Sequence, residues 1–168
     1  MKVISKNNGK KIAVITGGSE GIGAALVGEL LRNNYSVIAV SRSLKKLNKL
    51  KSTFSTFKED LKIFSVDVNN SKKLIYVSDK IKAPDLLVLN AGIYKPVDIE
   101  TFNIKTFVKQ SEVNYLGVIK SFDAFIKKML KKKSGTVLIM SSVAGWIGLP
   151  KASAYGPTKA ALRSFAQS

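Results

Sequence analysis

Five short apolar runs recur along the chain, separated by longer segments rich in lysine. The runs are residues 12–16 (IAVIT), 36–41 (SVIAVS), 61–68 (LKIFSVDV), 85–90 (DLLVLN) and 136–142 (TVLIMSS). They contain many β-branched residues and do not alternate cleanly with polar residues, which is typical of strands buried on both faces. The pattern therefore predicts five strands of a parallel sheet.

The segments between these runs have the apolar spacing of amphipathic helices. One of them places apolar side chains at helical intervals among lysines, at Leu44, Leu47, Leu50 and Phe54. Alternating strands and helices with right-handed crossovers predict a Rossmann-like, doubly wound α/β sheet with helices on both faces. We expect two helices within residues 101–133, because Asn114 and Gly117 interrupt the apolar pattern there.

Length limits the number of domains, and composition limits the side chains available for catalysis. A chain of 168 residues without internal repeats or linkers is expected to form one domain over residues 1–168. It has no Cys and no His, which excludes disulfides, thiolate nucleophiles and the commonest general base. We expect no metal site, and any catalysis must use Tyr, Lys, Ser or carboxylate groups.

The chain is strongly basic, with 28 Lys+Arg against 11 Asp+Glu and a formal net charge of +17. This charge favours anionic ligands, whether phosphate cofactors, nucleic acid or acidic lipid. The lysines are dispersed and accompany no recognisable nucleic-acid module, so we expect a basic surface and no nucleic-acid partner. The basic lead-in MKVISKNNGKK lacks the apolar core of a signal peptide. With no apolar run near the roughly 20 residues of a membrane span, we expect a cytoplasmic protein without membrane insertion.

The first apolar run leads directly into the glycine-rich turn TGGSEGIG. Glycines let the backbone approach a pyrophosphate, and amide groups at the N-terminus of the next helix hold its negative charge. Such a turn can also serve only a tight strand-to-helix connection. Its place between a strand and an apolar helix favours a dinucleotide site, and the residues expected there are Gly17, Ser19, Gly21, Ile22 and Gly23.

The second run ends in Ser41 and Arg42, where NAD-binding sheets usually carry a carboxylate for the ribose 2′-hydroxyl. An arginine at this point can pair with a 2′-phosphate, so we favour NADP(H) over NAD(H), with Ser19 as a second donor. Two alternatives stay open: Arg42 can be a plain exposed cation, and the nearby Glu20 would repel a phosphate.

Tyr155 precedes Lys159 by four residues, which places both side chains on one helical face. The spacing alone carries little weight, because lysine is frequent and Tyr76 and Lys80 match it as well. Tyr155, however, opens the segment after the fifth run, with Ser142 thirteen residues before it at the end of that run. This context favours Tyr155 and Lys159 as a candidate catalytic pair.

Further motifs follow the glycine turn in order along the chain. They are Asp67-Val68, Asn90-Ala91-Gly92, V-N-x-x-G with Asn114, S-S-x-x-G with Ser142, and Y-x-x-x-K with Tyr155 and Lys159. With these motifs the chain resembles a short-chain dehydrogenase/reductase of the standard NAD(P)-dependent branch. The resemblance implies the strand order 3-2-1-4-5 and an oxidoreductase that interconverts a small-molecule carbonyl and alcohol.

The resemblance also implies roles for individual residues. Tyr155 would contact the cofactor and exchange a proton with the substrate oxygen, while Lys159 stabilises the phenolate and binds the nicotinamide ribose. Ser142 would donate a hydrogen bond to the substrate oxygen, although it can also cap the next turn. Asn114 would hold a water that links Lys159 to solvent, although an Asn here can instead bond to backbone. The remaining cofactor contacts would come from Asp67, Val68, Asn90, Ala91 and Gly92.

The sequence departs from the family after Tyr155. In the family this helix is longer and strands 6 and 7 follow it, whereas this sequence stops at Ser168. We therefore interpret the chain as C-terminally truncated, with the fifth strand an exposed apolar edge. Two hypotheses follow: an active NADP(H)-dependent oxidoreductase, or an inactive cofactor-binding remnant. A basic nucleic-acid binder is a third, supported only by charge. Full-length relatives commonly form homo-oligomers, an expectation we do not extend to this shorter chain.

Overall fold

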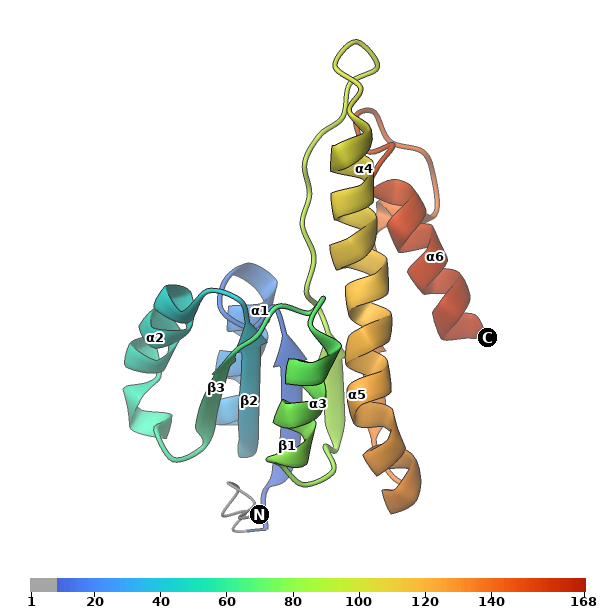
Figure 1. The fold of residues 1–168 in the computed structure, drawn as a ribbon. Helices are drawn as coiled ribbons and strands as arrows, with labels where there is room; N and C mark the ends of the chain where they lie inside the picture. Colours follow the sequence, from blue (N-terminus) through green and yellow to red (C-terminus); the bar gives the residue numbers. More distant parts are fainter. Residues whose placement is uncertain (1–8) are drawn as a thin grey trace.

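A parallel sheet of five strands forms the centre of the molecule (Figure 1). The computed structural model describes residues 9–168, so most of the basic lead-in lies outside the described residues. The strands are β1 (Lys11–Thr16), β2 (Tyr35–Ser41), β3 (Leu61–Ser65), β4 (Leu86–Leu89) and β5 (Thr136–Ile139). They lie in the order β3-β2-β1-β4-β5, which confirms the predicted doubly wound fold. β3 and β5 end earlier than the apolar runs predicted.

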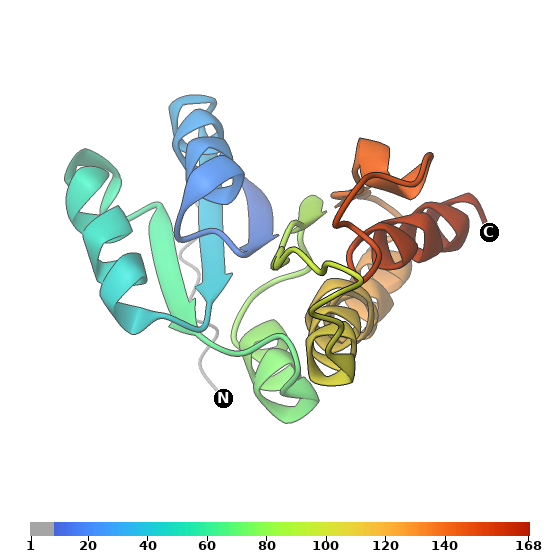
Figure 2. The same ribbon diagram turned by 90° about the horizontal axis from the view of Figure 1, so that it is seen from above.

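Helices cover both faces of this sheet (Figure 2). They are α1 (Gly21–Arg32), α2 (Leu44–Thr53), α3 (Ser71–Asp79), α4 (Ile104–Ser111), α5 (Gly117–Lys132) and α6 (Gly156–Gln167), with the short turns η1 (Ser55–Phe57), η2 (Glu112–Leu116) and η3 (Val143–Gly145). Among the described residues, none of these helices combines the length and apolarity that crossing a bilayer requires.

Two apolar clusters, one on each face of the sheet, explain why the strands are continuously apolar. In β1, Ile12 and Val14 pack with α3, α5 and α6 on one face. The neighbouring Ile15 packs with α1 and α2 on the other face. β2 divides its side chains in the same way, with Ile38 in the first cluster and Val37 in the second. Apart from the strand ends, the positions of the inner strands are therefore buried on both faces, as expected for a parallel sheet.

β5 is one of the two edge strands, and it pairs with β4 and with no other strand among residues 9–168. Its Leu138 is 41% exposed, while Val137 and Ile139 are partly buried against the cluster that contains α5. Within the described part of the chain, β5 is thus the exposed apolar edge that the sequence predicted.

The two helices predicted within residues 101–133 are present as α4 and α5, but the interruption between them does not separate them. α4, η2 and α5 follow one another without a break, and Figure 1 shows them as one long helical rod. The interruption is the π-helical turn η2, which contains Asn114. Gly117 follows it where the rod meets the loop after β3, since a Cβ there would lie 2.6 Å from Val68 Cγ2. A wide turn of this kind keeps the helix continuous and is frequent at functional sites.

Candidate active site

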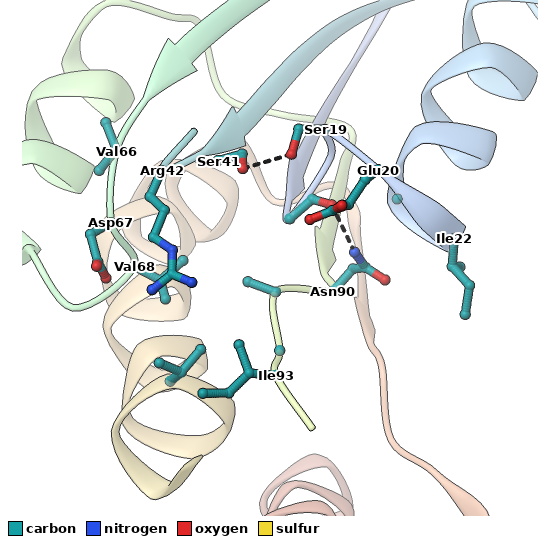
Figure 3. Close-up of a pocket in the computed structure, with 15 residues that line it drawn as sticks. Ser19, Glu20, Ile22, Ser41, Arg42, Val66, Asp67, Val68, Asn90 and Ile93 are labelled. Atoms are coloured by element: carbon teal, nitrogen blue, oxygen red, sulfur yellow. Dashed lines mark hydrogen bonds between the residues drawn. The ribbon is translucent and has the colours of Figure 1, made fainter. Parts of the chain in front are cut away.

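A cavity of about 280 Å³ opens at the carboxyl ends of β1, β2, β3 and β4 (Figure 3). It is lined by Gly17, Ser19, Glu20, Ile22, Gly23, Ser41, Arg42, Val66, Asp67, Val68, Asn90, Ala91, Gly92, Ile93 and Val113. All of the predicted cofactor residues are among them except Gly21, Tyr155 and Lys159. This position, beside the point where the strand order reverses, is where doubly wound sheets bind their ligands.

The glycines of the first turn are required by close backbone contacts. A Cβ on Gly23 would lie 2.2 Å from the carbonyl oxygen of Gly17, and a Cβ on Gly17 would lie 2.8 Å from Ala91 Cα. Gly21, with φ +53°, adopts a left-handed conformation at the start of α1. The N-cap residue Glu20 makes no side-chain hydrogen bond to this first turn. Bare backbone and the amino end of α1 therefore border the cavity, an arrangement suited to a phosphate group.

Polar side chains after β1 and β2 border the same cavity. Ser19 Oγ and Ser41 Oγ lie 2.8 Å apart, and Figure 3 shows the Arg42 guanidinium extending into the cavity. The carboxylate of Glu20, whose charge counted against a phosphate site, lies 2.7 Å from Lys46 Nζ. Both side chains are largely exposed, so water screens this ion pair, but the pairing still offsets the negative charge.

The connections after β1 and β4 are tied together by a network that sequence reasoning missed. Thr16 is fully buried at the end of β1, and its Oγ1 accepts hydrogen bonds from the amides of Asn90 (3.1 Å) and Ala91 (3.2 Å). Asn90 Nδ2 donates to the carbonyl oxygens of Thr16 and Gly17, each at 3.2 Å. Thr16 is the first residue of the glycine-rich turn TGGSEGIG, but its hydrogen-bond partners lie more than 70 residues further along the chain. Its role could therefore not be read from the local sequence.

Asp67 and Val68 lie where the resemblance expects them, at the border of the cavity after β3. Asp67 Oδ1 accepts a hydrogen bond from the amide of Asn69 at 2.8 Å. The carboxylate therefore stabilises its own turn, while both residues also line the cavity (Figure 3).

Lys159 is the most unusual charged residue of the site. Lys159 belongs to α6 and is only 3% exposed. Its Nζ donates a hydrogen bond to the carbonyl oxygen of Met140 at 2.7 Å. Burial disfavours the ammonium form and lowers the pKa of Lys159 to about 8. Nζ lies 5.5 Å from the centroid of the Tyr155 ring, so the charge faces the phenol.

The second Tyr-x-x-x-Lys match provides an internal comparison. Lys80 Nζ lies 5.1 Å from the ring centroid of Tyr76, a separation close to that of Tyr155 and Lys159. Tyr76, however, is 54% exposed on α3, whereas Tyr155 is partly buried and its partner Lys159 is buried. The distance follows from helical spacing, whereas burial and position separate Tyr155 from its exposed counterpart.

Gly92 connects the cavity to the candidate catalytic residues. A Cβ on Gly92 would lie 3.4 Å from Asn114 Oδ1 and 3.7 Å from Lys159 Nζ. Asn114 is fully buried in η2 and pairs with the backbone of Ile93, accepting from its amide at 2.7 Å and donating to its carbonyl oxygen at 2.8 Å. The backbone pairing that the sequence left open for Asn114 is therefore present in the structure.

Two serines precede α6. Ser142 Oγ accepts a hydrogen bond from the amide of Ala144 at 3.2 Å and so caps η3, as the alternative interpretation of this residue held. Accepting this bond leaves the hydroxyl hydrogen of Ser142 able to donate. Ser141 donates to the carbonyl oxygen of Lys159 at 3.0 Å and holds α6 against the end of β5.

Comparisons with known proteins agree with this architecture. Residues 11–168 match the short chain dehydrogenase family. An uncharacterized oxidoreductase of Staphylococcus epidermidis is 31% identical over 163 residues, which cover 95% of this chain and 70% of that protein. The 3-dehydrosphinganine reductase of Danio rerio is 33% identical, with 96% of this chain and 51% of that protein covered.

The names of a further relative and of a solved structure mention a cofactor. The NADPH-dependent 1-acyldihydroxyacetone phosphate reductase of Saccharomyces cerevisiae is 29% identical, and the match covers 94% of this chain and 54% of that protein. The structure of ElxO with NADP bound has a TM-score of 0.85 and 29% identity, covering 93% of this chain and 65% of that one. This chain thus spans between about half and 70% of these proteins. The chain belongs to the short-chain dehydrogenase family.

Proposed function

We propose that this chain carries the cofactor site and the proton-transfer residues of an NADP(H)-dependent oxidoreductase that interconverts a carbonyl and an alcohol. The observation that carries the proposal is the buried ammonium of Lys159, which faces Tyr155 beside the Gly92 end of the glycine-lined cavity. Membership of the short-chain dehydrogenase family supports the reaction class.

The residues around the cavity suit a phosphorylated dinucleotide. Gly17 and Gly23 leave bare backbone at the amino end of α1, where a pyrophosphate would find amide donors. Arg42, with Ser19 and Ser41 next to it, would hold a ribose 2′-phosphate through charge-assisted hydrogen bonds. The names of the yeast relative and of the NADP-bound structure support the choice of NADP(H) over NAD(H).

When bound, the nicotinamide supplies or accepts the hydride. The residues of this chain then handle the proton and the substrate oxygen. Tyr155 would donate a proton to the carbonyl oxygen during reduction and accept it back during alcohol oxidation. Lys159 would stabilise the resulting phenolate with its ammonium group, and Ser142 would hold the substrate oxygen through its hydroxyl hydrogen. Asn114 would keep the loop at Ile93 in place beside Lys159.

Removing the phenol tests this assignment. We expect Tyr155→Phe to reduce carbonyl turnover about 100- to 10,000-fold, because proton transfer by a positioned side chain contributes that much to catalysis. NADPH binding, measured by fluorescence titration, should stay within about twofold of wild type, since the cavity is unchanged. Tyr76→Phe is the matched control, because Tyr76 has the same spacing to a lysine but occupies an exposed position on α3. A Tyr155→Phe protein as fast as wild type over a panel of carbonyl compounds contradicts the assignment.

Removing the guanidinium tests the cofactor preference separately. Arg42→Ala should weaken NADPH binding about 10- to 100-fold, because a hydrogen bond to a charged group usually contributes that much to affinity. NADH binding should stay nearly unchanged, because NADH has no 2′-phosphate. Arg32→Ala is the control, because Arg32 is exposed and pairs with Glu29 on the far end of α1. Equal weakening for both cofactors in fluorescence titrations would argue against a 2′-phosphate contact.

A further inference from the structure

After β4 the chain runs in an extended path alongside α4 and η2 before it turns back into the rod (Figure 1). Two buried amide side chains, one helical turn apart, hold this path. Asn114 pairs with Ile93, as described above. Gln110, only 1% exposed, accepts from the amide of Lys95 at 3.2 Å and donates to its carbonyl oxygen at 3.0 Å. We call Gln110 and Asn114 the amide clamp.

The clamp fixes the backbone on both sides of Tyr94. The ring of Tyr94 lies edge-on to the ring of Tyr155, with centroids 5.2 Å apart and an interplanar angle of 67°. One step further, the amide of Val97 donates to the carbonyl oxygen of Lys151 at 3.0 Å, which ties the same path to the loop that leads into Tyr155. The amide clamp and the Val97–Lys151 bond thus together hold Tyr94 against Tyr155, the candidate proton donor.

Neither Gln110 nor Tyr94 belongs to the motifs that identify the family. A buried amide is costly unless its donor and acceptor are both paired, and Gln110 uses both on a single residue of the loop. Edge-to-face aromatic contacts add to the stability that such a backbone arrangement gives. Tyr94 is nevertheless 54% exposed, so its ring presents a free apolar surface next to Tyr155.

We propose that Gln110 is a positioning residue that, by fixing Lys95, holds Tyr94 as an aromatic wall of the substrate site. This inference rests on the proposed function. The wall favours carbonyl compounds with an apolar or aromatic group next to the reacting carbon, which would pack on the ring of Tyr94. Gln110 itself touches neither substrate nor cofactor and acts through Tyr94.

Hydrogen exchange tests the clamp without any activity measurement. Gln110→Leu keeps the volume but removes both bonds to Lys95, so the Lys95 amide should exchange about tenfold faster. The Ile93 amide, held by Asn114, and the Val14 amide in the buried β1 serve as references for an intact fold. Lys109→Leu, on the exposed side of the same helix, is the control variant and should leave Lys95 unchanged. Unchanged exchange at Lys95 in Gln110→Leu overturns the clamp.

Kinetics then test whether Gln110 acts through Tyr94. With an aryl carbonyl substrate, Gln110→Leu should raise KM about tenfold and leave NADPH binding within about twofold, because the cofactor cavity does not include Lys95. In a Tyr94→Ala background the same change should have no further effect on KM. Multiplicative effects of the two substitutions overturn the positioning role. A wild-type protein that reduces no carbonyl compound refutes the proposed function. The hydrogen-exchange experiment does not depend on activity, so it still tests the amide clamp in that case.

Discussion

Lys159 illustrates at the scale of one residue how the fold shapes the chemistry. Its ammonium is buried against Met140, and burial lowers its pKa to about 8 from an ordinary value of 10.5. Between these values the unfolded chain binds a proton at Lys159 that the folded chain lacks, so stability rises with pH there. At neutral pH the buried ammonium of Lys159 destabilises the folded protein. The same positive charge lies where it would stabilise the phenolate of Tyr155.

This linkage gives a pH prediction. Compared with Lys159→Met, the wild-type protein should gain free energy of unfolding between pH 8 and pH 10.5. The total gain should be at most about 3 kcal/mol, and it should be lost again as the pH falls through 8. Urea unfolding of both proteins at a series of pH values measures the difference. Lys127→Met, at a largely exposed position on α5, is the control. A difference that stays constant across this window contradicts the buried charge.

The motif residues were predictable from sequence because each motif is short and its spacing carries the signal. Arg42, Asp67 and Asn90 all border the cavity as expected. Thr16 and Gln110 were missed because their importance lies in partners that the chain brings together only on folding. The capping bond of Ser142 and the backbone pairing of Asn114 were recognised as alternatives, but spacing could not choose between them and catalytic roles.

At the scale of elements, the strands and helices followed from apolar periodicity, while the π-helical turn did not. The pattern around Asn114 and Gly117 predicted an interruption between two helices but not its kind, because a wide turn and a helix end disturb the apolar spacing in the same way. Only the packing of Gly117 on Val68 and the bonds of Asn114 to Ile93 distinguish the two. η2 thus turns the buried amide of Asn114 toward the segment after β4 without ending the rod.

The turn between β1 and α1 gives a prediction at the same scale. In Gly23→Ala the new methyl group would meet the carbonyl oxygen of Gly17, and because this is backbone, the whole turn must shift. We expect a loss of stability of about 1–3 kcal/mol and at least about tenfold weaker NADPH binding. Gly148→Ala is the control, because nothing lies within 4 Å of a Cβ there. Urea unfolding and fluorescence titration measure both effects, and wild-type values in both would show that the turn is not packed as described.

At the scale of the whole molecule, the fold was predictable because a parallel sheet with helices on both faces leaves a strong apolar signature. The two clusters on opposite faces of β1 and β2 account for the continuous apolar runs. The net charge of +17 predicted a preference for anions but not its location. The structure offers a defined place for an anionic cofactor, where bare glycine backbone, the start of α1 and Arg42 meet.

Transfer of a labelled hydride tests the central claim most directly. The protein is incubated with NADPH that carries deuterium in place of both hydrogens on the reactive carbon and with a panel of aryl and alkyl carbonyl compounds, and the alcohols are analysed by mass spectrometry. The account predicts an alcohol heavier by one deuterium on the former carbonyl carbon, formed by wild type and Tyr76→Phe and nearly absent with Tyr155→Phe. NADPH binding without any labelled alcohol, or equal labelling by the Tyr155→Phe protein, would contradict it.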